Sequence, residues 1–156
     1  MSDEHFMRLA IAKAREGVEA GNTPFGSCVV KDGKVICTAH NEVWKNTDIT
    51  AHAEVAVLRK ACRELGTVDL SGCVLYSTCE PCPMCFSAIH WARISRLVYG
   101  ARIEDARSLG FNELTISNEQ MKTLGGSKVE IEGPFLLEEN LDLFRYWSSL
   151  PDTRLY

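Results

Sequence analysis

The sequence contains no run of about 18 apolar residues, the length that a membrane-spanning helix needs. Its start lacks a basic segment followed by an apolar one, so we expect no secretory signal peptide and a cytoplasmic protein. No internal repeat, low-complexity stretch or linker interrupts the 156 residues. We therefore expect a single domain over 1–156, long enough to bury one real core, without a membrane anchor.

Basic residues are not in excess either. The formal net charge is −4, the lysines and arginines are scattered, and the C-terminal third is acidic. A protein that grips a nucleic-acid backbone usually carries a basic patch. The charge therefore disfavours a nucleic-acid partner, although a local basic patch is compatible with an acidic total.

Cysteine, in contrast, is abundant: the chain has seven, an odd number. Without a secretion signal, metal binding is favoured over a disulfide framework. Four cysteines stand in apolar patterns and are interpreted as small buried hydrophobic residues: Cys28, Cys37, Cys62 and Cys73. The other three are clustered: Cys79, Cys82 and Cys85.

The spacing of Cys82 and Cys85 predicts a metal site. Residues three apart lie on one face of a helix, so both sulfurs can reach one ion. Two thiolates need a third ligand, and His52 is the best candidate. Zinc takes Cys and His in tetrahedral sites, and catalytic sites keep the fourth position open for water. We predict one Zn²⁺ per chain, held by His52, Cys82 and Cys85.

Glu54, two residues after His52, is the natural proton carrier for that water. Both side chains can serve one site only if a helix begins just before His52 and the metal lies over its N-terminus. His-x-Glu followed by Pro-Cys-x-x-Cys is the signature of zinc-dependent base deaminases, in which the Glu is not a ligand. The predicted reaction is attack of zinc-bound hydroxide on the ring carbon bearing the amine, with Glu54 as proton shuttle and ammonia leaving.

A closed structural zinc site is the alternative, with Cys79 as the fourth ligand. The protein would then be a non-catalytic zinc scaffold, and Glu54 beside the ligands would have no task. We interpret Cys79 instead as a packing residue at the end of a strand.

Hydrophobic periodicity and turn signals predict a mixed α/β chain. Helices are expected over 4–20, 51–65, 83–93 and 135–148. Strands are expected over 25–31, 34–39, 73–77, 96–99 and 127–132. Asp32-Gly33 predicts a type I′ hairpin turn, whereas 40–50 looks irregular and 101–124 shows no clear pattern.

A hairpin followed by helix, strand, helix and strand predicts a mixed sheet with helices on both faces and right-handed parallel crossovers. Sites in such sheets form beyond the carboxyl ends of strands. His52 and Cys82 each stand at a helix start after a strand and loop, so two helix N-termini can converge there. Their partial positive charge favours the thiolate of Cys82.

Other residues are weaker candidates. Asn41 ends the second hairpin strand on the presumed site edge, where it serves as a turn residue or a ligand contact. Phe25 and Trp91 are core aromatics or platforms for a planar base. On residue type alone, Glu113 is a solvated acid and Tyr156 a frayed end. We interpret His40 and His90 as structural histidines.

The motifs resemble those of the cytidine deaminase-like superfamily over nearly the whole chain. This resemblance implies a three-layer α/β/α sandwich around a five-stranded mixed sheet. Within the superfamily, the chain is most similar to bacterial guanine deaminases and plant guanosine deaminases. The shared segments are Pro24–Gly26, Thr50–Glu54, Ser77–Cys85, Ala88–Ala92, Val98–Gly100, Gly110-Phe111 and the terminal tyrosine.

The resemblance implies deamination of guanine to xanthine, or of guanosine to xanthosine, in purine metabolism and nucleobase salvage. It also implies a domain-swapped homodimer in which the tail 151–156 crosses to the partner subunit. Phe25 would flank the base, Asn41 would hold it, Glu113 would recognise it and Tyr156 would complete the pocket; Ala53 and Trp91 complete the candidate contacts. Asn112-Glu113 replaces the usual Asp-Asp, which puts the exact base in question.

Two other deaminase functions share the catalytic residues. A tRNA adenosine deaminase would need basic surface around its pocket, which the acidic C-terminal third disfavours. A deaminase of cytosine or of another amino-heterocycle, such as a triazine or a pterin-like ring, has the same core motifs. The choice between base and nucleoside stays open.

Overall fold

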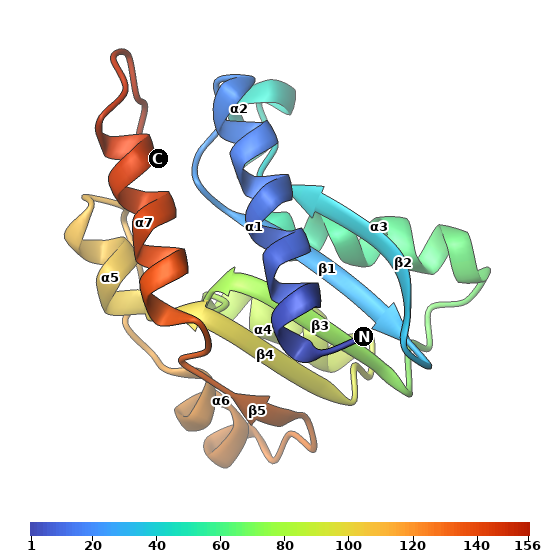
Figure 1. The fold of residues 1–156 in the computed structure, drawn as a ribbon. Helices are drawn as coiled ribbons and strands as arrows, with labels where there is room; N and C mark the ends of the chain where they lie inside the picture. The colour runs from blue at the N-terminus through green and yellow to red at the C-terminus, as the bar shows by residue number, and fades with distance from the viewer.

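A tight hairpin begins the sheet. Asp32 and Gly33 both have positive φ, 49° and 72°, as a type I′ turn requires. They join β1 (Gly26–Lys31) to β2 (Lys34–His40), which confirms the predicted hairpin. The computed structural model describes residues 1–156, the whole chain (Figure 1).

The sheet has five strands in the order β2-β1-β3-β4-β5. β1 pairs antiparallel with β2 and with β3 (Cys73–Cys79). β3, β4 (Arg96–Ala101) and β5 (Glu130–Glu132) are parallel. The predicted five-stranded mixed sheet is therefore confirmed.

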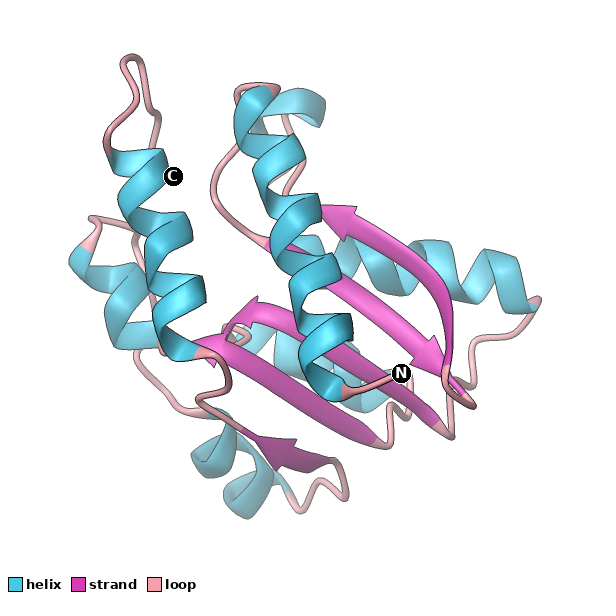
Figure 2. Cartoon of the chain, in the orientation of Figure 1, coloured by secondary structure: helices cyan, strands magenta, loops and turns pink.

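Helices cover both faces of this sheet, as the α/β/α prediction requires (Figures 1 and 2). On one face, α1 (Asp3–Glu19) packs on β1, β2 and β3, and α7 (Leu137–Ser148) packs on β4. On the other face lie α3 (Ala53–Leu65) and α4 (Pro83–Trp91). None of the helices in the structure is long and apolar enough to cross a membrane.

Three short helices occupy segments in which the sequence pattern predicted no helix. They are α2 (Val43–Asn46), α5 (Ile103–Ser108) and α6 (Asn118–Gly125). Such short helices complete too few turns to show a 3.6-residue period. Capping defines α6 instead: Ser117 Oγ accepts from the Gln120 amide at 3.1 Å, and the Gln120 side chain accepts from the Ser117 amide at 2.9 Å.

Side chains that alternate along the strands build two separate cores. Val29, Leu75 and Leu97 are fully buried against α3 and α4, in a cluster with Val57 and Ile89. The neighbouring strand positions face α1: Cys28, Val30, Tyr76 and Val98 pack with Phe6, Met7, Ala10 and Ile11. Because both faces of the central strands are buried, the sequences of these strands are continuous apolar runs.

Two glycines let helices approach the sheet closely. A Cβ on Gly26 would lie 2.3 Å from the Ala10 carbonyl oxygen, so only glycine lets α1 rest on β1. A Cβ on Gly100 would lie 2.2 Å from the Asn140 side chain and 2.5 Å from the Thr78 carbonyl oxygen. Both glycines stand near the sheet edge that carries the site described next.

The register brings three strand ends to that edge. Gly26 pairs with His40, and Ser27 pairs with Ser77. The start of β1, the end of β2 and the end of β3 therefore meet. The residues just beyond these strands are the ones that the sequence analysis singled out.

Candidate active site

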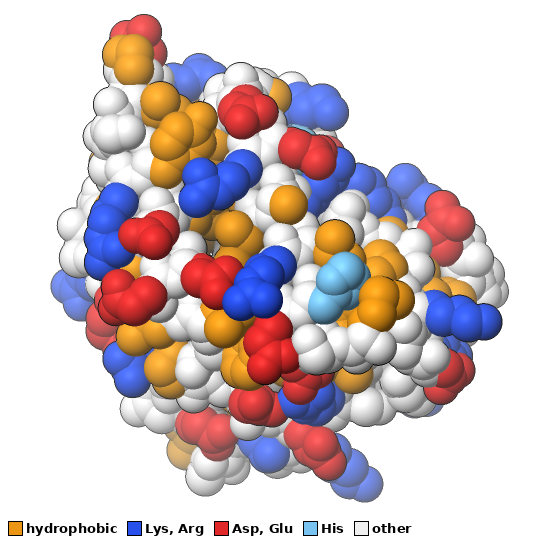
Figure 3. All heavy atoms as spheres, viewed as in Figure 1, with side chains coloured by type: hydrophobic (Ala, Val, Ile, Leu, Met, Phe, Trp, Pro, Cys, Tyr) orange, Lys and Arg blue, Asp and Glu red, His pale blue; other side chains and the backbone are white.

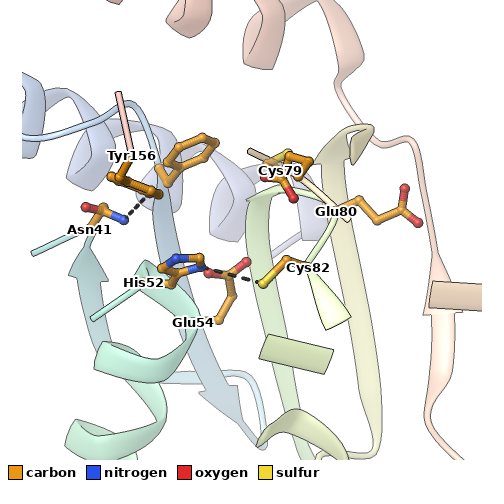
Figure 4. A pocket seen from close by; sticks show the side chains of 9 residues that line it. Asn41, His52, Glu54, Cys79, Glu80, Cys82 and Tyr156 are labelled. Carbon is orange, nitrogen blue, oxygen red and sulfur yellow. Dashed lines mark hydrogen bonds between the residues drawn. The ribbon is translucent and has the colours of Figure 1, made fainter. Parts of the chain in front are cut away.

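The three predicted metal ligands converge over two helix starts. His52 is the N-cap of α3 and Cys82 the N-cap of α4, and neither side chain forms a capping hydrogen bond. Cys85 lies one turn inside α4. The three ligand atoms lie within 4.8 Å of one another. The helix was expected to begin just before His52 but begins at Ala53, so His52 stands outside its first turn as the N-cap. Figure 4 shows His52, Glu54 and Cys82 pointing into one space.

The separation of these atoms fits one tetrahedral zinc ion. His52 Nδ1 lies 3.6 Å from Cys82 Sγ and 3.4 Å from Cys85 Sγ. Bonds of about 2.0–2.1 Å to nitrogen and 2.3 Å to sulfur place tetrahedral ligands roughly 3.6 Å apart. One imidazole and two thiols are also a donor set that zinc prefers.

The surroundings of Cys82 favour its thiolate. Its pKa falls to about 4, first because Cys85 bonds to it and then because His52 does, although burial opposes the shift. The pKa of Cys85 moves the opposite way, first because of the same bond and then because of burial. Binding of a metal ion would require both thiols to lose their protons.

Glu54 stands beside the ligands without joining them. Its side chain is buried, and its carboxylate accepts a hydrogen bond from Ser77 Oγ at 3.2 Å. Burial raises the pKa of Glu54, while the neighbouring His52 lowers it. A buried carboxyl whose pKa is raised towards the working pH suits a group that accepts and returns protons.

A cavity opens directly above these groups. It contains seven of the ten residues predicted as ligand, catalytic or substrate contacts, together with Cys79 and Glu80. Its lining is Phe25, Asn41, His52, Glu54, Cys79, Glu80, Cys82, Glu113 and Tyr156 (Figure 4). Segments from both ends of the chain therefore meet at the site.

Asn41 and Tyr156 face each other across this cavity. Asn41 is fully buried, and its Oδ1 accepts from the Val43 amide at 3.1 Å. This bond leaves the amide nitrogen of Asn41 as a donor, and it donates to the Tyr156 hydroxyl at 2.7 Å. Thr23 Oγ1, which sequence reasoning missed, lies 3.3 Å from the same hydroxyl. In this structure the tail reaches the pocket of its own chain, and its crossing to a partner subunit stays a prediction.

Glu113 brings a second carboxyl to the cavity. It is half-buried, and burial raises its pKa to about 7, with the negative Cys82 and Glu54 adding to the effect. On the wall beside it, the ring of Phe25 packs edge-on against Phe111 at 5.1 Å between centroids. Besides Glu54, the cavity thus offers the Asn41 amide donor, the Glu113 carboxyl and an aromatic wall.

Glu80 had not been singled out, and its carboxylate points away from the metal ligands (Figure 4). One oxygen accepts from the Ile103 amide at 3.4 Å and the other from the Asn118 amide at 3.0 Å. The Asn118 side chain in turn donates to the Pro81 carbonyl at 2.7 Å. We call these three bonds the Glu80 brace; it ties the loop before Cys82 to both ends of the segment that carries Glu113.

Trp91 is a correction to the sequence analysis. It ends α4 with 83% of its surface exposed and faces a groove with Val55, Leu58 and Val68. Trp91 follows Cys85 by six residues, which turns it about 240° around the helix and moves it about 9 Å along the axis. It therefore cannot stack on a ring above the metal ligands.

Ala53 and Cys79 lie beside the predicted ligands, but only Cys79 lines the cavity. Ala53 is fully buried between His52 and Glu54 and does not line the cavity, so its substrate contact stays a prediction. Cys79 lines the cavity, but its thiol donates to the Arg102 carbonyl at 3.6 Å and lies outside the three-ligand group. The closed four-ligand alternative is not what the structure has. His40 and His90 bond to the Asn41 carbonyl and to Ser127, in line with structural roles.

An α/β/α sandwich with an imidazole, two thiols and a buried carboxyl at converging helix starts defines a zinc-dependent deaminase. Comparison with known families agrees: the profile of the cytidine and deoxycytidylate deaminase zinc-binding region matches residues 1–101. The chain belongs to this family and is a zinc-binding hydrolase that removes an amine.

Particular relatives are similar over different lengths. The guanine deaminase of Bacillus subtilis (strain 168) is 41% identical over 160 aligned residues, covering 100% of both chains. The tRNA-specific adenosine deaminase of Agrobacterium fabrum is 50% identical over 98 residues, covering 63% of this chain and 64% of that one. The solved guanine deaminase of Nitrosomonas europaea is 28% identical, with a TM-score of 0.88 over 96% of this chain and 86% of that one.

Proposed function

We propose that this protein hydrolyses guanine to xanthine and ammonia, or guanosine to xanthosine. The full-length similarity to a guanine deaminase supports this substrate, because it includes the C-terminal third that contributes Glu113 and Tyr156. The observation that carries the proposal is the pairing of the Asn41 amide donor with the Glu113 carboxyl in one cavity.

The hydrogen-bonding groups of the rings explain why this pairing matters. Guanine and guanosine carry an N–H at N1 for a carboxylate acceptor, and oxygen and nitrogen acceptors for an amide donor. Adenosine and cytidine have no ring N–H once the sugar is attached, so a buried carboxylate would lack a partner. Leaving a buried polar group unpaired costs about 1–3 kcal/mol, and more for a charged group. Free cytosine keeps one N–H and stays in the test.

Each residue of the site would have its own role in the reaction. His52, Cys82 and Cys85 would hold zinc, which supplies a water that ionises near neutral pH. Glu54 would take a proton from that water and give it to the ring nitrogen beside the amine-bearing carbon while the water oxygen bonds to that carbon. It would then take the second proton from the same oxygen and deliver it to the amine, which leaves as ammonia when the C–N bond breaks. Burial raises the pKa of Glu54 and so makes it a stronger base for the uptake of the proton. Phe25 would wall one face of the ring.

Such an activity belongs in nucleobase salvage, and we infer a cytoplasmic, homodimeric enzyme with a small-molecule substrate. The resemblance that suggests a swapped tail also suggests the dimer. Sedimentation of the zinc-loaded protein tests the dimer, and a single monomeric species would refute it.

Deamination of adenosine in tRNA is the second candidate, because of the 50% identity over 98 residues. Two features oppose it. Tyr156 covers the cavity, which leaves little room for flanking nucleotides, and the net charge is −4. A polynucleotide needs cationic contacts along its phosphates.

The test is ammonia release from a panel of guanine, guanosine, cytosine, cytidine, adenine, adenosine and a tRNA anticodon stem-loop. The zinc-loaded protein should act on guanine or guanosine alone. Glu113→Gln should keep zinc and lose kcat/KM for guanine by at least tenfold, whereas Glu119→Gln, an exposed acid on α6, should match the parent. Ammonia release from the stem-loop alone or from cytosine alone would refute guanine or guanosine as the substrate and would leave the deamination chemistry standing.

A further inference from the structure

We propose that Trp44 and Arg154 are positioning residues that latch the C-terminal tail over the active site. The pair, which we call the tail latch, would control how firmly Tyr156 is held in the cavity. The inference rests on the proposed function only in taking Tyr156 as part of the substrate pocket. The contacts themselves can be tested without any substrate.

The side chain and the backbone of Arg154 both contact the indole of Trp44. The guanidinium carbon lies 4.3 Å from the centre of the Trp44 ring, within the range of a cation–π contact. The Trp44 indole N–H donates to the Arg154 carbonyl oxygen at 3.3 Å. No carboxylate forms an ion pair with Arg154, so the indole is the partner of its charge.

The next two tail residues rest on the opposite wall of the site. Leu155 packs over Gly110, where an added Cβ would lie 2.8 Å from Leu155 Cδ1. The Asn112 amide donates to the Tyr156 carbonyl oxygen at 3.4 Å, a long hydrogen bond. The tail therefore bridges α2 and the segment 110–113, and it has few other polar attachments.

The tail latch is coupled to Asn41 through a single turn of helix. Trp44 follows Val43 in α2, and the Val43 amide fixes the side chain of Asn41. Asn41 in turn donates to the Tyr156 hydroxyl. One short helix thus holds the tail at Arg154 and the presumed base contact at Asn41, which gives Trp44 an influence on the site that it does not touch.

The cavity that Tyr156 helps to line is small, about 20 Å³, which is room for one water molecule. An outer chamber of about 330 Å³ adjoins it and has Ile49, Met84 and Leu114 as apolar walls. Four residues line both spaces: His52, Cys82, Glu113 and Tyr156. The position of Tyr156 therefore decides how much room a ring has beside the predicted metal ligands, and the tail latch would fix that position.

Hydrogen exchange of the Asn112 amide, followed by NMR on the zinc-loaded protein, tests the latch directly, because this amide donates to the Tyr156 carbonyl oxygen. Trp44→Ala removes the indole, and Arg154→Gln removes the charge and leaves the fold untouched because Arg154 is exposed. Each variant should speed exchange of the Asn112 amide, by about tenfold for Trp44→Ala and severalfold for Arg154→Gln. Arg107→Gln, at an exposed arginine of α5, is the matched control and should not change it.

Kinetics then connect the latch to the site. A loosened tail should raise KM for guanine about tenfold in Trp44→Ala without lowering kcat, and Trp44→Phe, which keeps an aromatic face, should recover part of the difference. Exchange that changes less than twofold in both Trp44→Ala and Arg154→Gln would overturn the latch, whatever the enzyme's substrate. Faster exchange in a protein that deaminates nothing in the panel would support the latch and refute the proposed function instead.

Discussion

Replacing Glu80 with glutamine should cost about 2–3 kcal/mol of stability and weaken substrate binding while zinc is retained. Each carboxylate oxygen of Glu80 accepts one backbone N–H, from Ile103 at 3.4 Å and from Asn118 at 3.0 Å. A hydrogen bond to a charged group contributes about 1.5–3 kcal/mol. Glutamine keeps one acceptor but turns an NH₂ group toward the other N–H. Since Glu80 is buried, water cannot replace the lost bond.

The prediction is checked by urea unfolding of zinc-loaded protein, by zinc content and by steady-state kinetics. KM for guanine should rise severalfold, because the Glu80 brace holds the segment that carries Glu113, whereas zinc stoichiometry should stay at one per chain. Glu104→Gln, at an exposed acid on α5, is the control. A loss below about 0.5 kcal/mol with unchanged KM would show that the brace neither supports the fold nor positions Glu113.

Three further outcomes follow from the structure. Glu54→Gln should keep zinc but reduce kcat by at least about a hundredfold, since an amide cannot carry protons; ammonia release near the parent rate would remove Glu54 from the mechanism. Asp3→Asn should destabilise the protein by about 1 kcal/mol near neutral pH, because Arg96 donates to the Asp3 carboxylate at 2.7 and 3.2 Å and lowers its pKa. That stability is present above the ordinary pKa of 3.8 and fades as pH falls through the lowered value, so thermal melts of parent and variant should converge in acid. Gly100→Ala should cost 1–3 kcal/mol or more, roughly the penalty of overpacking, whereas Gly125→Ala, which has open space, should be neutral or stabilising; equal melting temperatures would contradict the crowding at Gly100.

The catalytic half of the site could be predicted because its signals are local. His52 and Cys82 could be placed at helix starts from local start and stop signals in the sequence. Cys85 follows Cys82 by one helical turn. The hairpin was predictable for the same reason, since Asp32-Gly33 favours one turn type.

The substrate half could not be derived in this way. Nothing near Tyr156 in the sequence indicates that it meets Asn41, 115 positions away. Glu80 stands inside the cysteine cluster but turns toward two helix ends that the sequence pattern did not predict. The prediction that Trp91 contacts the substrate was wrong for a different reason. The helix was correctly expected there, but the direction in which its aromatic residue points depends on how the helix packs.

The catalytic and substrate halves of the site also differ in how far the similarity to known relatives extends. The zinc-binding profile ends at residue 101, and the similarity to the tRNA adenosine deaminase covers 63% of the chain, whereas the similarity to guanine deaminase covers all of it. Glu113 and Tyr156 both lie beyond residue 101 and reach the site through the Glu80 brace and the tail latch. Changes in the last third can therefore reshape the pocket without moving a metal ligand. Asn112-Glu113 lies beyond residue 101, so we expect the longer carboxyl of Glu113 to affect which ring binds while Glu54 and the helix starts keep the chemistry.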